Sequence, residues 1–405
     1  MFNKKVLQMV KKTITSEFVS YGHPDKIADQ IADAILDEFL KKDKNVRAGI
    51  EVLLKDNIVV LGGEISSTSS IDYDKVVRSV YKDIHFSVEH HLSSDDIKVI
   101  NLIGKQSQEI HNGVDKNDGS IGAGDQGFMI GFASNETPVY MPLGIYVAKS
   151  ICQYVANGHW DEERQMLLCF GPDTKSQVIV DYDENGNASI SSILVSTMSE
   201  LPLEETRNTI KDIILNNAME MDDNIFRQYI KSKDIKIDIN PCGSWKIGGP
   251  VSDCGVTGRK LVVDQYGGYS NIGGGNLSGK DMTKVDKSAA YMARYLAKNI
   301  VASGICDAAR VELSYMIGVP EPSSINIEMN RNQEKEGVIK SWIKNNIDLT
   351  PKGIIKRFDG SYPRNYHLSK YGHFGVDVNK YRTSQERYPW EKLDICDSLR
   401  EELRK

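Results

Sequence analysis

One glycine-rich segment carries residues suited to holding an anion. It covers residues 273–281, and Gly274 to Lys280 fits the spacing G-x-x-x-x-G-K of a phosphate-binding loop. The fit fails at Asp281, where such a loop needs Ser or Thr for magnesium, and no strand leads directly into the segment. Glycines still let backbone N–H groups converge on an anion, and the lysine adds positive charge. The segment therefore predicts a phosphate contact, with a solvated surface turn as the alternative.

A second basic segment precedes the first. Residues 248–260 contain four glycines and end on adjacent Arg259 and Lys260. Downstream, Lys284 and Asp286 flank the predicted start of a helix. Lysines with a carboxylate at this spacing suit a phosphate chain that magnesium partly neutralises. The alternative is an exposed first helical turn.

His23, Asp25 and Lys26 form a third group at the start of another predicted helix. Together at a helix N-terminus they suit a phosphate and its metal ion. A single histidine before a helix is more often a structural residue, and a first-turn Asp often only stabilises the helix dipole. Both interpretations stay open from these residues alone.

Two single carboxylates and one long loop are also candidates for function. Glu51 interrupts an apolar strand and Glu64 follows two glycines, so we expect buried carboxylates that need a cation or a hydrogen-bonding partner. Residues 106–127 hold five glycines and show no sustained periodicity. Loops this long in compact domains are usually disordered or functional. We expect a mobile active-site loop at 106–127, with a flexible connector as the alternative.

The elements that position these groups follow from hydrophobic periodicity. Residues 25–41 place an apolar side chain at every fourth position, which predicts a core-facing helix that starts near Pro24. Two β-rich runs, 47–54 and 58–65, are separated by turn residues and predict a hairpin. The other predicted helices are 72–84, 143–156, 203–217, 285–303 and 334–346, and the other predicted strands are 97–103, 128–133, 177–182, 188–198, 235–240, 260–266, 310–319 and 325–329.

The order of these elements predicts the fold class. Hairpins mixed with helices, without strict alternation of strand and helix, argue for an α+β fold. Three such rounds predict three similar domains in a pseudo-threefold arrangement, each a mixed β-sheet covered by helices on one face. The expected domains are 13–112, 128–240 and 241–390, and the last of these holds the glycine-rich phosphate loops.

Composition narrows the class of protein. The chain has 405 residues, of which 40% are hydrophobic, enough for two or three domains with a sizeable core. A net charge of −6 argues against binding to nucleic acid or anionic lipid, so a polyanion would have to bind in a local pocket. No segment approaches the roughly 20 apolar residues of a membrane span. Six scattered cysteines without a C-x-x-C pair predict reduced, mostly buried thiols in a cytoplasmic protein.

Seven segments together resemble the S-adenosylmethionine synthetase family, the methionine adenosyltransferases. They follow the family's order over nearly the whole chain, at 22–28, 62–65, 104–107, 122–127, 247–260, 273–286 and 371–375. The resemblance implies an ATP-binding transferase of S-adenosylmethionine biosynthesis and one-carbon metabolism. In this family the sulfur of L-methionine attacks C5′ of ATP in line, and water then hydrolyses the released triphosphate to phosphate and diphosphate.

The resemblance also implies roles for particular residues. It implies two Mg²⁺ per active site, held by Asp25 and Asp286, and one K⁺ per subunit at Glu51. The residues with implied catalytic roles are His23, Asp125, Lys175 and Lys280. Those implied to bind ATP are His23, Asp173, Lys175, Ser244, Trp245, Asp253, Arg259, Lys260, Asn276 and Lys280. Those implied to bind methionine are Glu64, Gln106, Asp253 and Lys284.

One segment departs from the family's pattern. The family commonly has Gly-Arg-Phe before Ile-Gly-Gly-Pro, whereas this chain has Gly243, Ser244, Trp245 and Lys246 there. Trp245 can replace Phe as an aromatic face for adenine. Ser244 cannot replace Arg as a cation, and Lys246 is the nearby residue that could compensate in part.

The implied chemistry needs no general base, because a thioether is an uncharged nucleophile. Catalysis must then come from alignment of the sulfur with C5′ and from electrostatic stabilisation of the leaving triphosphate. The resemblance further implies a homodimer or homotetramer with active sites between subunits. Two other classes remain as alternatives: a non-catalytic ATP-binding regulatory or assembly protein, and a small-molecule kinase, which would need a hydroxyl acceptor and a base.

Overall fold

The secondary structure repeats one order of elements three times. The computed structural model describes residues 12–84, 86, 93–105, 121–157, 159–161, 166–168, 170–217, 229, 235–378 and 387–404. Each round consists of a long helix, a β-hairpin and a second helix, and the first two rounds add a strand. The rounds are α1 (Pro24–Leu40), β2 (Arg47–Lys55), β3 (Ile58–Ser66), α2 (Tyr73–Ile84) and β4 (Lys98–Asn101); then α4 (Leu143–Asn157), β8 (Thr174–Tyr182), β9 (Ala188–Thr197), α5 (Leu203–Asp212) and β10 (Lys236–Ile239); then α9 (Val285–Ala302), β12 (Ala308–Tyr315), β13 (Ser324–Met329) and α10 (Glu336–Asn346).

Shorter elements connect the rounds or follow them. The strands among them are β1 (Lys12–Val19), β5 (Gly127–Ser134), β6 (His159–Asp161), β7 (Met166–Leu168) and β11 (Gly255–Val256). The α-helices among them are α7 (Gly249–Ser252), α8 (Leu261–Asp264), α11 (Pro351–Phe358), α12 (Asn365–Tyr371) and α14 (Cys396–Arg404). The other short turns of helix are η1 (Ser94–Asp96), η2 (Ile213–Asn217), η3 (Gln333–Lys335) and η4 (Pro389–Glu391).

Each hairpin is extended by a strand that belongs to another round. The strand orders are β11-β2-β3-β4, β1-β8-β9-β10 and β13-β12-β5. The strand that precedes each long helix thus pairs with the hairpin of the next round, and β11, before α9, returns to the first. This cyclic exchange ties the three units together by backbone hydrogen bonds. How the chain divides into the domains 13–112, 128–240 and 241–390 stays a prediction.

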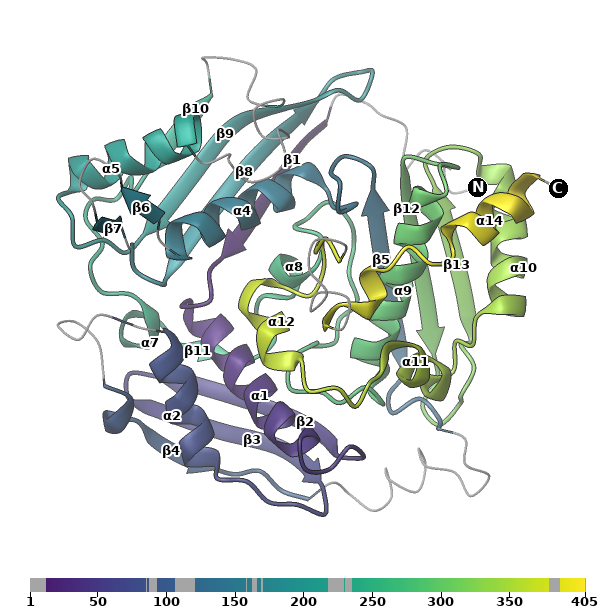
Figure 1. The fold of residues 1–405 in the computed structure, drawn as a ribbon, viewed down its shortest axis with the longest axis horizontal. Coiled ribbons are helices and arrows are strands. Elements are labelled where there is room, and N and C mark those ends of the chain that lie inside the picture. The colour runs from purple at the N-terminus through teal and green to yellow at the C-terminus, as the bar shows by residue number, and fades with distance from the viewer. Residues whose placement is uncertain are drawn as a thin grey trace.

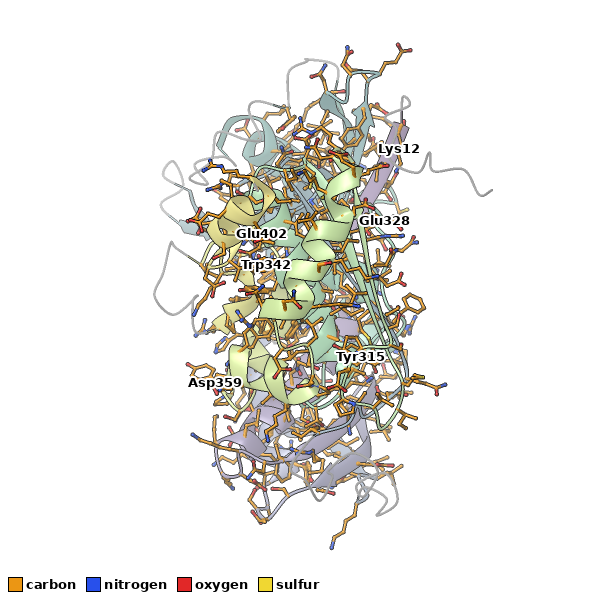
Figure 2. The ribbon with its side chains drawn as sticks, turned by 90° about the vertical axis from the view of Figure 1, so that its right-hand side faces the viewer. Lys12, Tyr315, Glu328, Trp342, Asp359 and Glu402 are labelled. Carbon is orange, nitrogen blue, oxygen red and sulfur yellow. The ribbon has the colours of Figure 1, made fainter. Side chains whose placement is uncertain are left out.

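The long helix of each round covers one face of a sheet. Helix α1 packs on β2, α4 packs on β1 and β8, and α9 packs on β5 and β12. Figure 1 shows the three helix-covered sheets arranged around α1, α8 and α12. Figure 2 views the third unit from the side, where Trp342 on α10 and Glu328 on β13 lie on neighbouring layers. The predicted α+β fold of three similar units is therefore confirmed.

The hydrophobic pattern of α1 explains its place in the first unit. Ile27, Ile31 and Ile35 are completely buried, and they pack with the inward residues of β2 and β3 in one core. The second and third units share a larger core, in which α9 is buried along nearly its whole length. A helix that is buried all round is typical of the centre of a large domain. No helix in the described ranges has the length and apolarity to cross a membrane.

Two predictions about local structure are wrong. Residues 260–266 do not form a strand, because the apolar run folds into the single turn of α8 and stops at Gly267 and Gly268, which have φ of +61° and +84°. The described cysteines are not mostly buried, since only Cys152 and Cys306 are. All five described cysteines are free thiols.

The predicted mobile loop lies largely outside the described residues, because the description omits 106–120. Its described end is anchored, since the N–H of Ala123 donates to the carbonyl of Val319 and the carbonyl of Ala123 accepts from the N–H of Gly318. Gly122 approaches the Gly318 backbone so closely that an added Cβ would lie 2.6 Å from its carbonyl oxygen. The function of this loop stays a prediction.

Candidate active site

His23 caps the N-terminus of α1 and is itself buried. Its Nδ1 accepts a hydrogen bond of 3.1 Å from the backbone N–H of Asp25. Burial lowers the pKa of His23 to about 2, and the positive charges of Lys260 and Lys175 lower it further. The ring is therefore neutral, and because Nδ1 is an acceptor, the ring proton resides on Nε2. His23 thus combines the structural role with a free donor for a ligand at the helix N-terminus.

Asp25 brings the histidine group and the second basic segment together. One carboxylate oxygen lies 2.6 Å from Lys260 Nζ, and the other accepts the backbone N–H of Val256 at 2.9 Å. The guanidinium of Arg259 is 3.7 Å from the same carboxylate. The exchange of β11 into the first sheet makes this contact possible, because β11 carries the segment onto β2 beside α1.

Asp173 and Lys175 enter this group from the second unit. Asp173 is buried just before β8; its Oδ2 accepts the N–H of Gly249 at 2.8 Å, and its Oδ1 has no partner among the described residues. Burial raises its pKa to about 6. Lys175 and Asp253 both lie close enough to influence the pKa of Asp173 and of His23. We call these residues the histidine group: His23, Asp25, Asp173, Lys175, Asp253, Arg259 and Lys260.

Lys280 anchors a second group at the edge of the first sheet. Its Nζ lies 2.5 Å from Asp286, in the first turn of α9. Its backbone pairs with Gly49 of β2, which pairs with Glu64 of β3. Lys280 and Glu64 therefore lie in one row across the sheet, about 10 Å apart given the strand spacing.

Lys284 and Asp125 complete the second group. Lys284 is the N-cap residue of α9, and its side chain passes Gly124, where an added Cβ would lie 3.5 Å from Lys284 Cδ. Asp125 follows at once and is exposed. We call these residues the lysine group: Glu64, Asp125, Lys280, Lys284 and Asp286. Within the described part of the chain, no hydrogen bond or ion pair joins the lysine group to the histidine group.

The expectation that Glu51 and Glu64 are buried is wrong for a single chain. Both are exposed, on the face of the sheet opposite α1. Glu51 accepts a short hydrogen bond from the hydroxyl of Thr257. Its carboxylate therefore remains open to a cation from solvent, or to whatever covers this face.

The remaining predicted residues lie in turns near the histidine group. Trp245 donates from its indole N–H to the carbonyl of Ile247 at 2.7 Å, and Ser244 beside it is exposed. Lys246 lies 4.0 Å from a carboxylate oxygen of Glu200, and whether it compensates for the missing arginine stays a prediction. Asn276 bonds within its own turn and faces Gly258, and Gln106 is outside the described residues.

The carboxylates fit a metal that is bound together with phosphates. No cluster of three or more His, Cys, Asp or Glu side chains in the described residues could hold an ion alone. Mg²⁺ is commonly bound by one or two carboxylates plus substrate phosphates and waters. Asp25 and Asp286 each supply one such carboxylate, and each lies next to a lysine that could bind a phosphate.

The sequence interpretation missed buried charges beneath these groups. Asp29 and Asp33 on α1 are fully buried and bind the two glycine-rich segments, and Lys287 on α9 lies 3.7 Å from Asp33. The available signal was the spacing of aspartates at every fourth position on an apolar helix. That spacing places them on one face, where charges are not expected in a core.

Two glycine-rich segments with adjacent lysines, a helix N-terminus and isolated carboxylates are together suited in their chemistry to a phosphate chain and its metal ions. Comparison with known proteins identifies the family. Residues 11–108, 120–245 and 247–392 match the N-terminal, central and C-terminal domains of S-adenosylmethionine synthetase. The chain belongs to the S-adenosylmethionine synthetase family, so the predicted family and enzyme class, methionine adenosyltransferase, are confirmed.

The similarity extends over whole chains. S-adenosylmethionine synthase of Mycoplasma mycoides subsp. mycoides is 42% identical over 397 residues, which cover 96% of this chain and 97% of the relative. That of Mesoplasma florum is 41% identical over 395 residues, with 96% and 100% covered. A solved S-adenosylmethionine synthetase from Campylobacter jejuni has a TM-score of 0.83 at 36% identity and covers 96% of this chain and 99% of its own.

Proposed function

We propose that this chain makes S-adenosylmethionine from ATP, L-methionine and water, and releases phosphate and diphosphate. The observation that carries the proposal is the contact of Asp25 with Lys260 beside the neutral His23. It places a hydrogen-bond donor, a cation and a metal-type carboxylate at one helix N-terminus. This combination suits a triphosphate as leaving group, on which negative charge grows as the C5′–O bond breaks.

The cations of both groups would bind the triphosphate. His23 donates from Nε2, and Lys175, Arg259 and Lys260 add positive charge around it. Lys280 does the same in the lysine group, where the glycine backbone adds N–H donors. Donors fixed in advance stabilise the leaving group without reorganisation in the transition state, and each can contribute about 3 kcal/mol.

Asp25 and Asp286 are the residues that would hold two Mg²⁺ ions, and Glu51 would hold K⁺. When bound, the magnesium ions neutralise the triphosphate and fix its orientation. The separation of the two carboxylates into different groups suits one ion at each end of the phosphate chain.

Complementary chemistry supports the assignments for adenosine and methionine. The unpartnered Oδ1 of Asp173 is buried and can accept a ribose hydroxyl, which would satisfy an oxygen that is otherwise costly to bury. Trp245 offers an aromatic face for adenine, and Asn276 would also contact ATP. Glu64 and Lys284 carry charges opposite to the ammonium and carboxylate of methionine, and Asp253 and Gln106 would contact it as well.

We propose that two copies of the chain form each active site, in a homodimer or homotetramer. The face of the first sheet that carries Glu51 and Glu64 also exposes a group of apolar side chains, and such patches mark interfaces. A cavity of about 570 Å³ between α1, α2 and α12 is lined by none of the predicted site residues. The exposed apolar residues are Leu53, Ile58, Ile100 and Leu102.

One reaction mixture separates this proposal from the alternatives. The protein is incubated with ATP, L-methionine, Mg²⁺ and K⁺, and the products are identified by mass spectrometry. We expect a sulfonium product with equal amounts of phosphate and diphosphate. ADP with a phosphorylated acceptor would indicate a kinase, and unchanged ATP that remains bound would indicate a non-catalytic protein. A Lys280→Met variant controls for contaminating enzymes. The cytoplasmic location stays a prediction.

A further inference from the structure

Helix α1 carries four buried aspartates on one face. Asp25, Asp29, Asp33 and Asp37 are spaced by four residues, and their side chains are at most 6% exposed. Each accepts at least one backbone N–H group from residues 256–366. The donors, in order along α1, are Val256 at 2.9 Å, Gly258 at 3.0 Å, Gly279 at 2.8 Å, and Asn365 and Tyr366 at 3.1 and 2.9 Å.

The burial of these four carboxylates costs free energy of folding. A buried charge must be paired and hydrogen-bonded, and like charges four residues apart on a helix repel. Lys26 partly neutralises Asp29 at 3.1 Å, and Lys287 lies 3.7 Å from Asp33. Apolar side chains at these positions would avoid that cost but would leave the backbone N–H groups of the two glycine-rich segments without acceptors. The carboxylates are therefore tied to the placement of those segments.

Asp29 binds the segment that carries the first pair of cations. Its partner, Gly258, directly precedes Arg259 and Lys260. Gly258 has φ of +73°, and an added Cβ would lie 2.9 Å from the side chain of Asn276. The peptide is thus fixed by its hydrogen bond to Asp29, and the Asn276 side chain packs closely against it. The direction in which Lys260 leaves the backbone follows from this attachment.

Asp33 binds the segment that carries the second cation. Its partner, Gly279, directly precedes Lys280 and has φ of +73°. The carbonyl of Gly279 accepts from Ile50 of β2 at 3.0 Å, and Lys287 Nζ donates to the carbonyl of Lys280 at 3.0 Å. The second oxygen of Asp33 has no partner among the described residues. The peptide before Lys280 is therefore fixed by α1, β2 and α9 together.

We propose that Asp29 and Asp33 are positioning residues that set where Lys260 and Lys280 stand. One turn of α1 separates the two aspartates, so a rigid rise of roughly 6 Å sets the offset between the two segments. This inference rests on the proposed function, which assigns both lysines to the triphosphate. It adds that α1 fixes the positions of both lysines through side chains that bind the protein backbone and not the substrate.

Asp37 provides the matched control. It is buried on the same face, but its hydrogen-bond partners lie in α12 and it binds neither glycine-rich segment directly. Its only link to Lys280 is indirect among the described contacts, through Asn365, which accepts from Lys287 Nζ at 2.7 Å. Asp37 accepts three hydrogen bonds, from the N–H groups of Asn365 and Tyr366 and from the Asn365 amide. If the four aspartates only stabilise the fold, Asp37→Ala should be the most damaging variant for both stability and activity.

The test compares Asp29→Ala, Asp33→Ala and Asp37→Ala in three measurements: thermal unfolding, KM and kcat with ATP, and binding of inorganic tripolyphosphate by calorimetry. We expect all three variants to unfold at lower temperature. Only the first two should lose kcat/KM for ATP, by about 100-fold as expected for misplaced groups, and bind tripolyphosphate more weakly. Their KM for methionine should stay within about twofold of the wild type.

Conservative variants keep the test decisive if an alanine variant does not fold. Asp29→Asn and Asp33→Asn retain an oxygen that accepts the glycine N–H, so they should recover most of the tripolyphosphate affinity. Equal losses of tripolyphosphate binding in the Asp37 variant, or unchanged binding in the Asp29 and Asp33 variants, would overturn the inference. A wild-type protein that makes no sulfonium product would instead contradict the proposed function.

Discussion

At the residue scale, burial and hydrogen bonding decide the protonation states at the proposed active site. His23 is neutral because it is buried among lysines, and its contact with the N–H of Asp25 fixes which nitrogen carries the proton. Burial opposes the charge of the Asp173 carboxylate and raises its pKa to about 6. These two residues therefore give predictions that separate structural from catalytic roles.

The two roles of His23 can be separated by a substitution that keeps the cap. Asn is also a good N-cap residue, so His23→Asn should change the free energy of unfolding by less than about 1 kcal/mol. It removes the Nε2 donor, and kcat should fall about 100-fold or more. His23→Ala should lose both stability and activity. Urea unfolding and steady-state kinetics measure the two effects, and a fully active Asn variant would show that His23 is structural only.

Asp173 predicts a specific pH dependence of stability. Its pKa is about 6 in the folded protein and near 3.8 when exposed, so its contribution to stability is fully present below about pH 4 and is lost as pH rises through 6. Asp173→Asn removes this loss and retains an acceptor for Gly249. The difference in free energy of unfolding between the variant and the wild type should therefore shift in favour of the variant by roughly 2 to 3 kcal/mol from pH 4 to pH 8.

Urea unfolding at several pH values measures this difference. Glu184→Gln, in the exposed turn between β8 and β9, is the matched control and should show no such trend. A constant difference in unfolding free energy between Asp173→Asn and the wild type would contradict the assigned pKa. The same variant should bind ATP more weakly, because it loses the carboxylate that we propose accepts a hydroxyl of the nucleotide.

At the element scale, the glycine-rich segments are rigid where they meet α1 and β2. Gly279 packs directly under the β2 backbone, whereas Gly274, in the same segment, has nothing within 4 Å of an added Cβ. The backbone geometry therefore requires a glycine at position 279 but not at position 274. The surrounding hydrogen bonds, from Ile50 and to Asp33, explain why the segment needs no regular secondary structure.

This difference predicts opposite outcomes for two alanine substitutions. In Gly279→Ala the Cβ would lie 2.3 Å from the carbonyl oxygen of Ile50, at φ of +73°, so the backbone must move. We expect a loss of about 1 to 3 kcal/mol in stability and a raised KM for ATP. Gly274→Ala should stay within about 0.5 kcal/mol of the wild type. Thermal unfolding and ATP kinetics measure both variants, and similar values for the two would contradict the described backbone.

At the scale of the whole molecule, the cyclic exchange of β1, β5 and β11 joins the three units into one body. The exchange brings residues that are more than 200 positions apart into direct contact, as for Asp25 and Lys260. It leaves the face of the first sheet opposite α1 uncovered, with the two glutamates and four exposed apolar residues described above. We expect a second copy of the chain to cover this face.

A charge placed on that face should separate the copies without unfolding them. Ile100 is 46% exposed on β4, so Ile100→Glu should leave the fold of one chain intact. Sedimentation should show a smaller species, and S-adenosylmethionine formation should fall at least tenfold, because we propose that each site is formed by two chains. Val338→Glu on α10, where the side chain is 38% exposed, is the control and should retain both assembly and activity. A fully active monomer would contradict the shared site.

The sequence alone determined the chemistry-bearing segments and most of the helices and hairpins around them. Glycine density, adjacent cations and apolar periodicity are local signals. They predicted α1 and the family correctly, and they singled out 248–260 and 273–281, whose role in binding stays a prediction. Periodicity reports which face of an element is buried but not what covers it. The sequence therefore could not reveal that β11 joins the first sheet, that Lys280 shares a row with Glu64, or that α1 holds both glycine-rich segments through buried aspartates. Those features depend on pairing between distant parts of the chain, where the free energy comes from contacts that exist only once the three units have closed on one another.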